Sequence, residues 1–331
     1  MKKIALAAAL VCAAQAAAAD EVELKFATVS PATAAAVREF YIPWSARVNE
    51  QGAGAVKIDL RPGNSLATSN TAYARVINDV VQIVYTLFTY VSGKFPLSEV
   101  AALPHSETSD LTSVALWRLY KSGMLDAEYD EAQPLMFVSL PQSILHLAKA
   151  PKSIDNLNGL RIIAPGKITA SSVTKLGATP LTLTTAEIYE SLQRGVADGA
   201  AVTWTAYQIY KFVDVTRYHV DQALGSAAGM VLMAKKRYAA LPEAARKVID
   251  ANSGEEMTRA YGKFWEDDDN KGRNAAKADP RRTVVQLSPA QHANWSAKVQ
   301  ATQDEWVRQT PGADKVLAKY NTLLADVKAG R

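Results

Sequence analysis

Short segments in which apolar and polar residues alternate are separated along this chain by longer segments with apolar residues at helical spacing. Alternation with a period of two is typical of a half-buried strand, and it predicts strands at 22–28, 56–60 and 81–85. Apolar residues at helical spacing predict helices at 33–50 and 70–79. Because strand and helix alternate repeatedly, we expect α/β domains whose sheets are covered on both faces.

The same alternation recurs in the second half of the chain before the pattern becomes helical. Strands are predicted at 137–140, 144–147 and 160–163, and helices at 168–176 and 184–193. After Leu241-Pro242, one long charged helix is predicted at 243–273, and two more helices lie within 288–329. The C-terminal third is therefore expected to be mostly helical.

No low-complexity linker separates the two halves, so we expect two lobes connected by strands that cross between them. About 310 residues remain after the predicted signal peptide, a length at which chains usually form two domains. The predicted division is a signal peptide at 1–19, lobe I at 20–140 plus 229–268, and lobe II at 141–228 plus 269–331. A crevice at the carboxyl ends of the strands is the expected place for a ligand.

The N-terminus has the three parts of a secretory signal peptide. Lys2 and Lys3 precede a short apolar stretch, and alanines up to Ala19 form a cleavage site before Asp20. A membrane-spanning helix needs about 20 apolar residues, and this stretch is shorter. We therefore expect export to the periplasm, with cleavage after Ala19.

Composition and charge exclude several kinds of chemistry. Cys12 is the only cysteine and lies in the predicted signal peptide, so the mature chain would have no disulfide and no cysteine metal site. The formal net charge of +4 falls to +2 when Lys2 and Lys3 are removed. Basic residues are interspersed with acidic ones, so nucleic acid is not an expected partner.

The spacings that mark common catalytic and metal sites are absent. The sequence has no G-x-S-x-G, no H-E-x-x-H and no G-x-x-x-x-G-K-[ST]. His105 with Glu107 and Asp110 comes nearest to a metal cluster, but this segment is typical of a polar loop, and His146 in an apolar strand is expected to be a core residue. We expect no metal, no cofactor and no catalysis. A periplasmic hydrolase or lyase stays an alternative, because active sites assemble in space.

Three segments together resemble a known family. They are Glu187–Gly199 (EIYESLQRGVADG), Ser92–Pro104 (SGKFPLSEVAALP) and Leu157–Gly166 (LNGLRIIAPG). They resemble the solute-binding proteins of TRAP (tripartite ATP-independent periplasmic) transporters, the DctP-type family, over nearly the whole mature chain. The resemblance implies a two-lobed α/β periplasmic solute-binding fold with crossing strands, a long connecting helix and a ligand cleft between the lobes. It also implies delivery of the ligand to the small and large membrane subunits of a permease.

The resemblance directs attention to one strand of lobe II. Most members of the family hold a carboxylate with an arginine on the strand that reads G-L-K-x-R-x-P-G, and this chain has Ile163 there. Arg161 shares the strand face, but the family commonly has a basic residue at that position too. Lys167, at the start of a helix where anions are stabilised, is the expected substitute. Gly195 is expected to end the preceding helix.

Further ligand contacts are expected from loops and strand ends. These candidates are Ser30, Asn64, Tyr85, Phe88, Tyr90, Thr203 and Trp204. The aromatic ones would suit a flat or apolar ligand body, although each alone is also explained by core packing. The resemblance thus predicts capture of a small organic acid with an aromatic or apolar body. A non-carboxylate ligand, or a role beside a sensor, stays open because Ile163 cannot donate a hydrogen bond.

Overall fold

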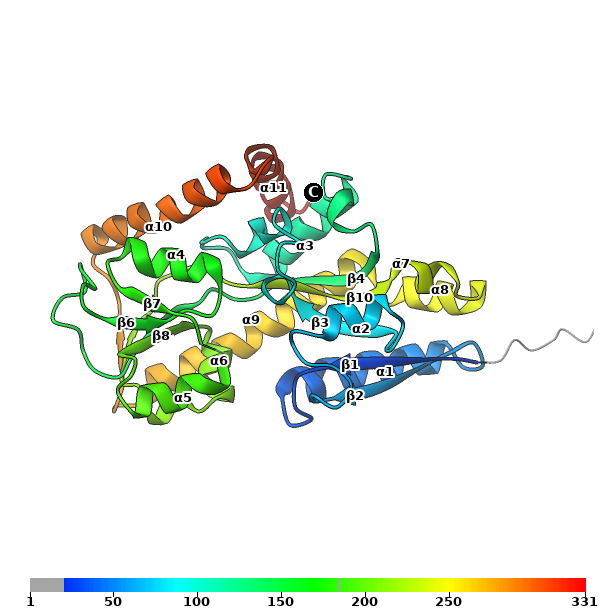
Figure 1. Cartoon of the computed structure of the whole chain (residues 1–331), viewed down its shortest axis with the longest axis horizontal. Helices are drawn as coiled ribbons and strands as arrows, with labels where there is room; N and C mark the ends of the chain where they lie inside the picture. The colour runs from blue at the N-terminus through cyan, green and yellow to red at the C-terminus, as the bar shows by residue number, and fades with distance from the viewer. Residues whose placement is uncertain (1–20, 184) are drawn as a thin grey trace, which may run out of the picture.

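The computed structural model describes residues 21–183 and 185–331, so the predicted signal peptide at 1–19 lies outside the described residues. Two lobes, each built around one sheet, lie side by side along the long axis of the molecule (Figure 1). None of the helices in the described ranges combines the length and the hydropathy of a membrane span.

The sheet of lobe I has the strand order β2-β1-β3-β10-β4. Its strands are β1 (Val22–Thr28), β2 (Val56–Pro62), β3 (Ile83–Leu87), β4 (Ala132–Ser139) and β10 (Ala228–Ala234). β1 pairs in parallel with β2 and β3, whereas β10 is antiparallel to β3 and β4. Every residue of β10 is buried, and a Cβ on Gly229 would lie 2.3 Å from the Thr86 carbonyl oxygen. This close approach of the backbones requires glycine at position 229.

Helices cover both faces of this sheet, as the alternating pattern predicted. They are the π-helix Ala36–Tyr41, α1 (Ile42–Gln51), α2 (Ala72–Ile77), α3 (Ser109–Lys121), α7 (Lys235–Ala239) and α8 (Glu243–Ala251). Phe26 and Ala27 are neighbours on β1 and belong to two different hydrophobic clusters, one on each face of the sheet. A period of two produces this division between the faces.

The sheet of lobe II has the order β11-β9-β5-β8-β6-β7. Its strands are β5 (Ile144–Leu147), β6 (Arg161–Ile163), β7 (Thr179–Leu181), β8 (Gly199–Val202), β9 (Tyr218–Val220) and β11 (Thr283–Val285). Its helices are α4 (Lys167–Lys175), α5 (Thr185–Gln193), α6 (Trp204–Ile209) and α10 (Pro289–Gln309). Ile162 and Ile163, neighbours on β6, point into separate clusters on the two faces.

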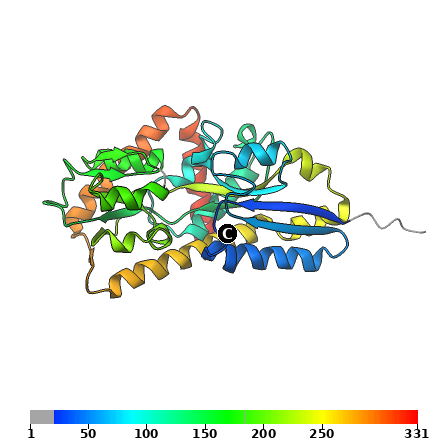
Figure 2. The same ribbon diagram turned by 60° about the horizontal axis from the view of Figure 1, so that its bottom comes forward.

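Three connections join the lobes. The chain crosses from β4 to β5 and returns from β9 to β10, and the helix α9 (Gly254–Ala278) runs along both lobes (Figure 2). α9 packs against α3 and β4 in lobe I and against α6 in lobe II. The single helix predicted at 243–273 was wrong, because the structure has α8 and α9 with a break at Asn252-Ser253, directly before Gly254. Gly254 has a φ of +93°, a left-handed conformation that interrupts the helix.

The C-terminal helices form a second bridge between the lobes. Trp295 of α10 lies in a cluster of lobe II, whereas Trp306, near the end of the same helix, lies in a cluster of lobe I. α11 (Ala313–Lys328) then packs on α3, and the Tyr320 hydroxyl donates a hydrogen bond to the Thr112 carbonyl oxygen. The expected division placed 269–331 in lobe II, but the apolar face of α11 is buried against lobe I.

Candidate functional site

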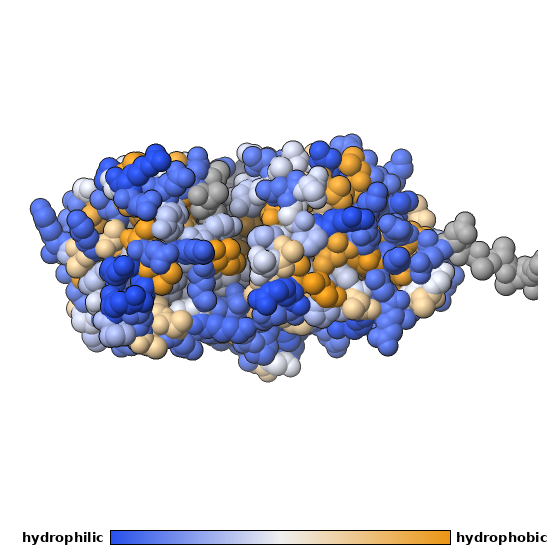
Figure 3. Space-filling view, turned by 90° about the horizontal axis from the view of Figure 1, so that it is seen from below, coloured by the Kyte–Doolittle hydropathy of each residue, from blue (hydrophilic) through white to orange (hydrophobic). Residues whose placement is uncertain are grey.

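A hollow separates the two lobes on the face seen in Figure 3, with apolar surface beside it. β1, β2 and β3 of lobe I are mutually parallel, and so are β6, β7 and β8 of lobe II. The loops that follow β3 and β6 meet at the boundary, where residues of both lobes line a pocket of about 140 Å³. The carboxyl ends of parallel strands are the usual position of a ligand site in such sheets.

Lobe I has two tyrosines on and just after β3, the strand whose following loop lines this pocket. Tyr85 is 7 % exposed and packs against Tyr41 and Tyr261, with ring centroids 6.2 Å away in both cases. Tyr90 ends the short 3-10 helix Phe88–Tyr90 and is 38 % exposed. Burial raises the pKa of both tyrosines above the ordinary value, so both hydroxyls stay protonated at neutral pH.

Phe88 turns away from Tyr90 and into the core of lobe I. Its ring lies 5.0 Å from that of Phe95, and only its edge reaches the pocket between the lobes. Phe95 belongs to the segment 92–104 that carried part of the resemblance. The buried Glu128 carboxylate accepts hydrogen bonds from the backbone N–H groups of Leu97 (2.6 Å) and Ser98 (3.0 Å) in the same segment. This motif therefore fixes the loop behind Phe88 and Tyr90.

Lobe II has a partly exposed tyrosine, Tyr210, which sequence analysis did not select. Tyr210 follows α6 directly and is 39 % exposed, and its ring stacks on Phe212 at 5.9 Å. Burial is the main cause of its raised pKa, and its proximity to Tyr90 of lobe I adds to the shift. Tyr210 also adds to the raised pKa of Tyr85. Tyr85, Tyr90 and Tyr210 thus influence one another electrostatically across the boundary between the lobes, but none of them lines the 140 Å³ pocket.

Thr203 and Trp204 lie where β8 passes into α6. The Thr203 Oγ1 accepts the Ala206 N–H at 3.1 Å and so caps the helix. Trp204 is fully buried, and its indole lies between the imidazoles of His146 (4.7 Å) and His219 (5.1 Å). Both residues support the cleft, and the Trp204 side chain has no exposed surface for a ligand.

The two histidines beneath Trp204 form a buried pair. Their Nδ1 atoms are 2.9 Å apart, and His146 Nε2 lies 3.3 Å from the Val202 carbonyl oxygen. A carbonyl only accepts, so we assign the His146 proton to Nε2 and make His219 Nδ1 the donor within the pair. His219 Nε2 is then a buried acceptor with no partner among the described residues. Burial lowers the pKa of His219 to about 3 and that of His146 well below its usual value. His146 is a core residue, as predicted.

Ile163 and Arg161 occupy opposite ends of β6. Ile163 is fully buried in an apolar cluster of lobe II and brings no donor to the site. Arg161 is engaged by Asp198, with Nε to Oδ2 at 3.0 Å and Nη2 to Oδ1 at 3.1 Å. It also donates to the Gly195 carbonyl oxygen at 2.7 Å. Gly195 has a φ of +68° just after α5, in agreement with its predicted role at the end of that helix. Arg161 thus holds the L-Q-R-G-V-A-D-G motif against β6.

Lys167 is the first residue of α4 and lies at the boundary between the lobes. It lines the 140 Å³ pocket together with Glu99 of lobe I. Burial raises the pKa of Glu99, and the ammonium of Lys167 partly opposes that shift. Lys167 therefore faces a carboxylate of the other lobe.

Ser30 and Asn64 lie in the loops after β1 and β2. The Ser30 carbonyl oxygen accepts the Gly63 N–H at 2.9 Å, which ties the two loops together. Ser30 is half-buried and Asn64 is exposed. Both belong to the strand-end region of lobe I, and within residues 21–183 and 185–331 neither forms a hydrogen bond with Tyr85 or Tyr90.

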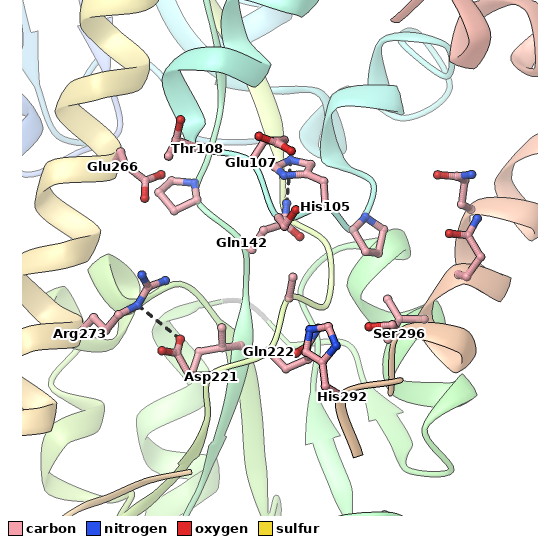
Figure 4. Close-up of a pocket in the computed structure, with 18 residues that line it drawn as sticks. His105, Glu107, Thr108, Gln142, Asp221, Gln222, Glu266, Arg273, His292 and Ser296 are labelled. Atoms are coloured by element: carbon pink, nitrogen blue, oxygen red, sulfur yellow. Dashed lines mark hydrogen bonds and ion pairs between the residues drawn. The ribbon is translucent and has the colours of Figure 1, made fainter. Parts of the chain in front are cut away.

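A second, polar cavity of about 540 Å³ lies at the hinge between α9 and α10 (Figure 4). Arg273 and Asp221 form an ion pair of 3.4 Å across it, and His105 Nε2 lies 2.9 Å from Gln142 Nε2. Burial lowers the pKa of His105 to about 4. Within the described ranges, no group of three histidine, cysteine or acidic side chains could hold a metal ion. None of the predicted ligand contacts lines this cavity.

One protein family and several solved structures match this chain. The family described as bacterial extracellular solute-binding protein, family 7 (DctP), matches residues 26–310. The outer membrane transporter protein TsaT of Comamonas testosteroni is 29 % identical over 244 residues, which are 71 % of this chain and 71 % of TsaT.

Two solved structures combine a similar fold with more than a quarter of identical residues. A TRAP solute-binding protein from a marine metagenome, specific for aromatic acid ligands and in complex with 3-hydroxybenzoate, has a TM-score of 0.85 and 26 % identity over 93 % of this chain and 99 % of that chain. One from Rhodoferax ferrireducens, in complex with copurified benzoate, has a TM-score of 0.84 and 27 % identity over 94 % of this chain and 100 % of that chain. The predicted two-lobed fold is confirmed.

Proposed function

Since this chain belongs to family 7 of the bacterial extracellular solute-binding proteins, the solute-binding proteins of TRAP transporters, we propose that its ligand is a small aromatic organic acid. The protein captures this acid in the periplasm and delivers it to the small and large membrane subunits of a permease. The predicted signal peptide at 1–19 supports this compartment. The protein acts as a binder and not as an enzyme.

The observation that carries the proposal is a pair of partly exposed tyrosines, one in each lobe. Tyr90 follows the loop side of β3 and Tyr210 follows α6, and they are 38 % and 39 % exposed. They come from different lobes, so a flat ring between them contacts both. Ile163, at the position where most relatives have an arginine, is fully buried and brings no charge to the site. Two similar proteins bind benzoate or 3-hydroxybenzoate, which agrees with this chemistry.

A panel of acids tests the proposal by ligand-induced thermal stabilisation. We expect benzoate and its ring-substituted derivatives to stabilise the protein by about 2.7 kcal/mol when present at 100 times their Kd. Cyclohexanecarboxylate has the same carboxylate on a ring that is not flat, and it should stabilise less. Preference for aliphatic dicarboxylates would contradict the aromatic ligand. Conversion of the stabilising compound into a product would contradict the assignment as a binder.

Lys167 is the expected source of positive charge for the acid. Because it is exposed and also faces Glu99, its contribution is that of a screened charge. Lys167→Ala should therefore weaken benzoate binding only about threefold to tenfold, as measured by isothermal titration calorimetry. Glu99→Gln is the matched variant, and it should strengthen binding because it frees the ammonium. If both variants weaken binding equally, the pair only holds the lobes together.

A further inference from the structure

The pocket of about 140 Å³ at the boundary between the lobes is lined by two side chains of opposite charge, one from each lobe. Glu99 lies in the short 3-10 helix Ser98–Ala102 of lobe I, and Lys167 is the first residue of α4 in lobe II. Uncharged residues make up the rest of the described lining. A carboxylate and an ammonium group therefore border the same small volume.

The protein itself leaves both charged groups without a direct partner. Glu99 is half-buried, and its carboxylate forms no hydrogen bond or ion pair with another described residue. The same holds for the Lys167 ammonium in the described part of the chain. Burial raises the pKa of Glu99 and Lys167 opposes that rise, so the two groups interact across the pocket without touching.

A neighbouring carboxylate shows how the fold satisfies such a group when it serves structure alone. Glu128 is buried, and it accepts hydrogen bonds from the backbone N–H groups of Leu97 (2.6 Å) and Ser98 (3.0 Å). Buried carboxylates are usually paired in this way, because removal from water is costly. Glu99 differs from Glu128 in that its carboxylate borders a pocket, where a bound molecule can supply the missing donor.

We propose that Glu99 and Lys167 together bind the polar head of the ligand, and that this head carries a hydroxyl or ammonium group on the carbon next to its carboxylate. The Lys167 ammonium binds the ligand carboxylate, and the Glu99 carboxylate accepts a hydrogen bond from the neighbouring hydroxyl or ammonium group. This inference rests on the proposed function and narrows its ligand to an aromatic 2-hydroxy or 2-amino acid.

The two opposite charges explain why a donor belongs beside the carboxylate. A plain carboxylate bound by Lys167 also lies near the like charge of Glu99, which is unfavourable. A hydroxyl or ammonium group on the adjacent carbon replaces this repulsion by a charge-assisted hydrogen bond. A cavity of about 150 Å³ holds one benzene molecule, and the proposed head is no larger. The ring then lies outside this pocket, in agreement with Tyr90 and Tyr210, which do not line it.

Anchors on two lobes also make the site sensitive to handedness. The carboxylate, the donor and the aromatic group of the proposed ligand are three different substituents of one carbon. In the wrong enantiomer, binding of the carboxylate and the ring turns the donor away from Glu99. Loss of one hydrogen bond to a charged group should make this enantiomer bind about tenfold more weakly.

A series of phenyl-substituted acids separates the donor from the carboxylate. Phenylacetate has no donor beside its carboxylate, mandelate has a hydroxyl, phenylglycine has an ammonium group, and α-methoxyphenylacetate has an oxygen that cannot donate. In calorimetric titrations of the full mature chain, we expect mandelate, phenylglycine or both to bind about tenfold more tightly than phenylacetate. The methoxy compound should bind no better than phenylacetate. Equal affinity for phenylacetate, mandelate and phenylglycine would refute the inference.

Glu99→Gln identifies the acceptor, because it removes the charge and keeps the shape of the side chain. We expect the preference for the better of mandelate and phenylglycine over phenylacetate, and the discrimination between its enantiomers, to fall about threefold or more, while phenylacetate binds more tightly. Glu243→Gln is the matched control and should keep the preference, since Glu243 lies on α8, is 71 % exposed and pairs with Lys247.

The outcomes distinguish this inference from the proposed function. If Glu99→Gln weakens phenylacetate and the preferred ligand alike, Glu99 serves the closure of the lobes and the inference is refuted. If benzoate binds but no donor improves binding, the inference fails and the proposed function stands. If no aromatic acid binds to the unsubstituted protein, both fail together. Circular dichroism and Tm confirm that each variant is folded.

Discussion

Replacing Trp204 with alanine is expected to lower the free energy of unfolding by about 3–5 kcal/mol and to abolish ligand capture. The indole is fully buried and contacts His146, His219 and Tyr207, whose ring centroid lies 5.3 Å away. Its Nε1 also donates to Asp221 Oδ1 at 3.3 Å. The substitution leaves a cavity beneath α6, and α6 is the helix that presents Tyr210. The effect on stability and the effect on binding therefore have one cause.

Trp295→Ala provides the matched control in the same lobe. Trp295 is also fully buried, and its Nε1 donates to the Ile154 carbonyl oxygen at 2.9 Å, but it lies in the cluster on the other face of the sheet. Denaturant unfolding should show a loss of similar size for both variants. Calorimetry with benzoate, below the unfolding transition, should show binding by Trp295→Ala and none by Trp204→Ala. Loss of binding in both variants would mean that lobe II as a whole, and not α6, determines capture.

The fold could be predicted from the sequence wherever one face of an element is polar. β1 has an alternating pattern and was predicted at its observed bounds, Val22–Thr28. β10 is buried at all its positions, so its sequence shows no alternation of apolar and polar residues. Its position could therefore not be predicted from periodicity. The break before α9 depends on the left-handed conformation of Gly254, and a glycine within a helical pattern does not by itself reveal its φ angle.

Sequence analysis could select site residues only from local patterns within single segments of the chain. Tyr85 and Tyr90 follow a predicted strand, so they were selected by their position in the chain. Tyr210 was missed because its place in the cleft depends on contact with the other lobe, and no local pattern encodes that contact. The same holds for the His146–His219 pair, whose members are 73 residues apart in sequence. Whether the selected residues contact the ligand stays a prediction until binding is measured.

The motifs that identify the family have structural roles that the sequence did not reveal. Asp198 holds Arg161, and Glu128 holds the backbone of Leu97 and Ser98, so these residues position the walls of the cleft from outside it. The proposed ligand contacts Tyr90 and Tyr210 lie outside these motifs. A chain can therefore keep the motifs of the family and change the chemistry of its ligand. This separation explains why fold and family followed from the motifs and the anchor did not.

Acid is expected to destabilise lobe II through the buried histidine pair. In the unfolded chain both histidines have a pKa near 6.5, whereas burial lowers the pKa of His219 to about 3 in the folded protein and that of His146 well below its usual value. Below pH ~6.5 the unfolded state therefore binds protons that the folded state does not, and stability falls as the pH decreases toward the folded pKa. His219 contributes a loss of about 2 kcal/mol between pH 7 and pH 5, and His146 acts in the same direction.

Other titrating groups also change the stability between pH 7 and pH 5, so the contribution of the histidine pair must be measured against a control protein. Burial lowers the pKa of His105 to about 4, which adds to the loss, and raises the pKa of Asp269 to about 7, which opposes it. The test is therefore a difference between proteins. Urea unfolding at pH 7 and pH 5 should show that His146→Leu/His219→Phe loses less stability than the unsubstituted protein over this interval, with a difference of about 2 kcal/mol or more.

The double variant keeps the other titratable groups of the chain, so its difference from the unsubstituted protein reports the buried pair. The buried pair cannot accept a proton without placing a positive charge near Arg282 and Arg217, whose guanidinium groups already disfavour the charged form of His219. An equal pH dependence in the unsubstituted protein and the double variant would show that the pair is already protonated in the folded state.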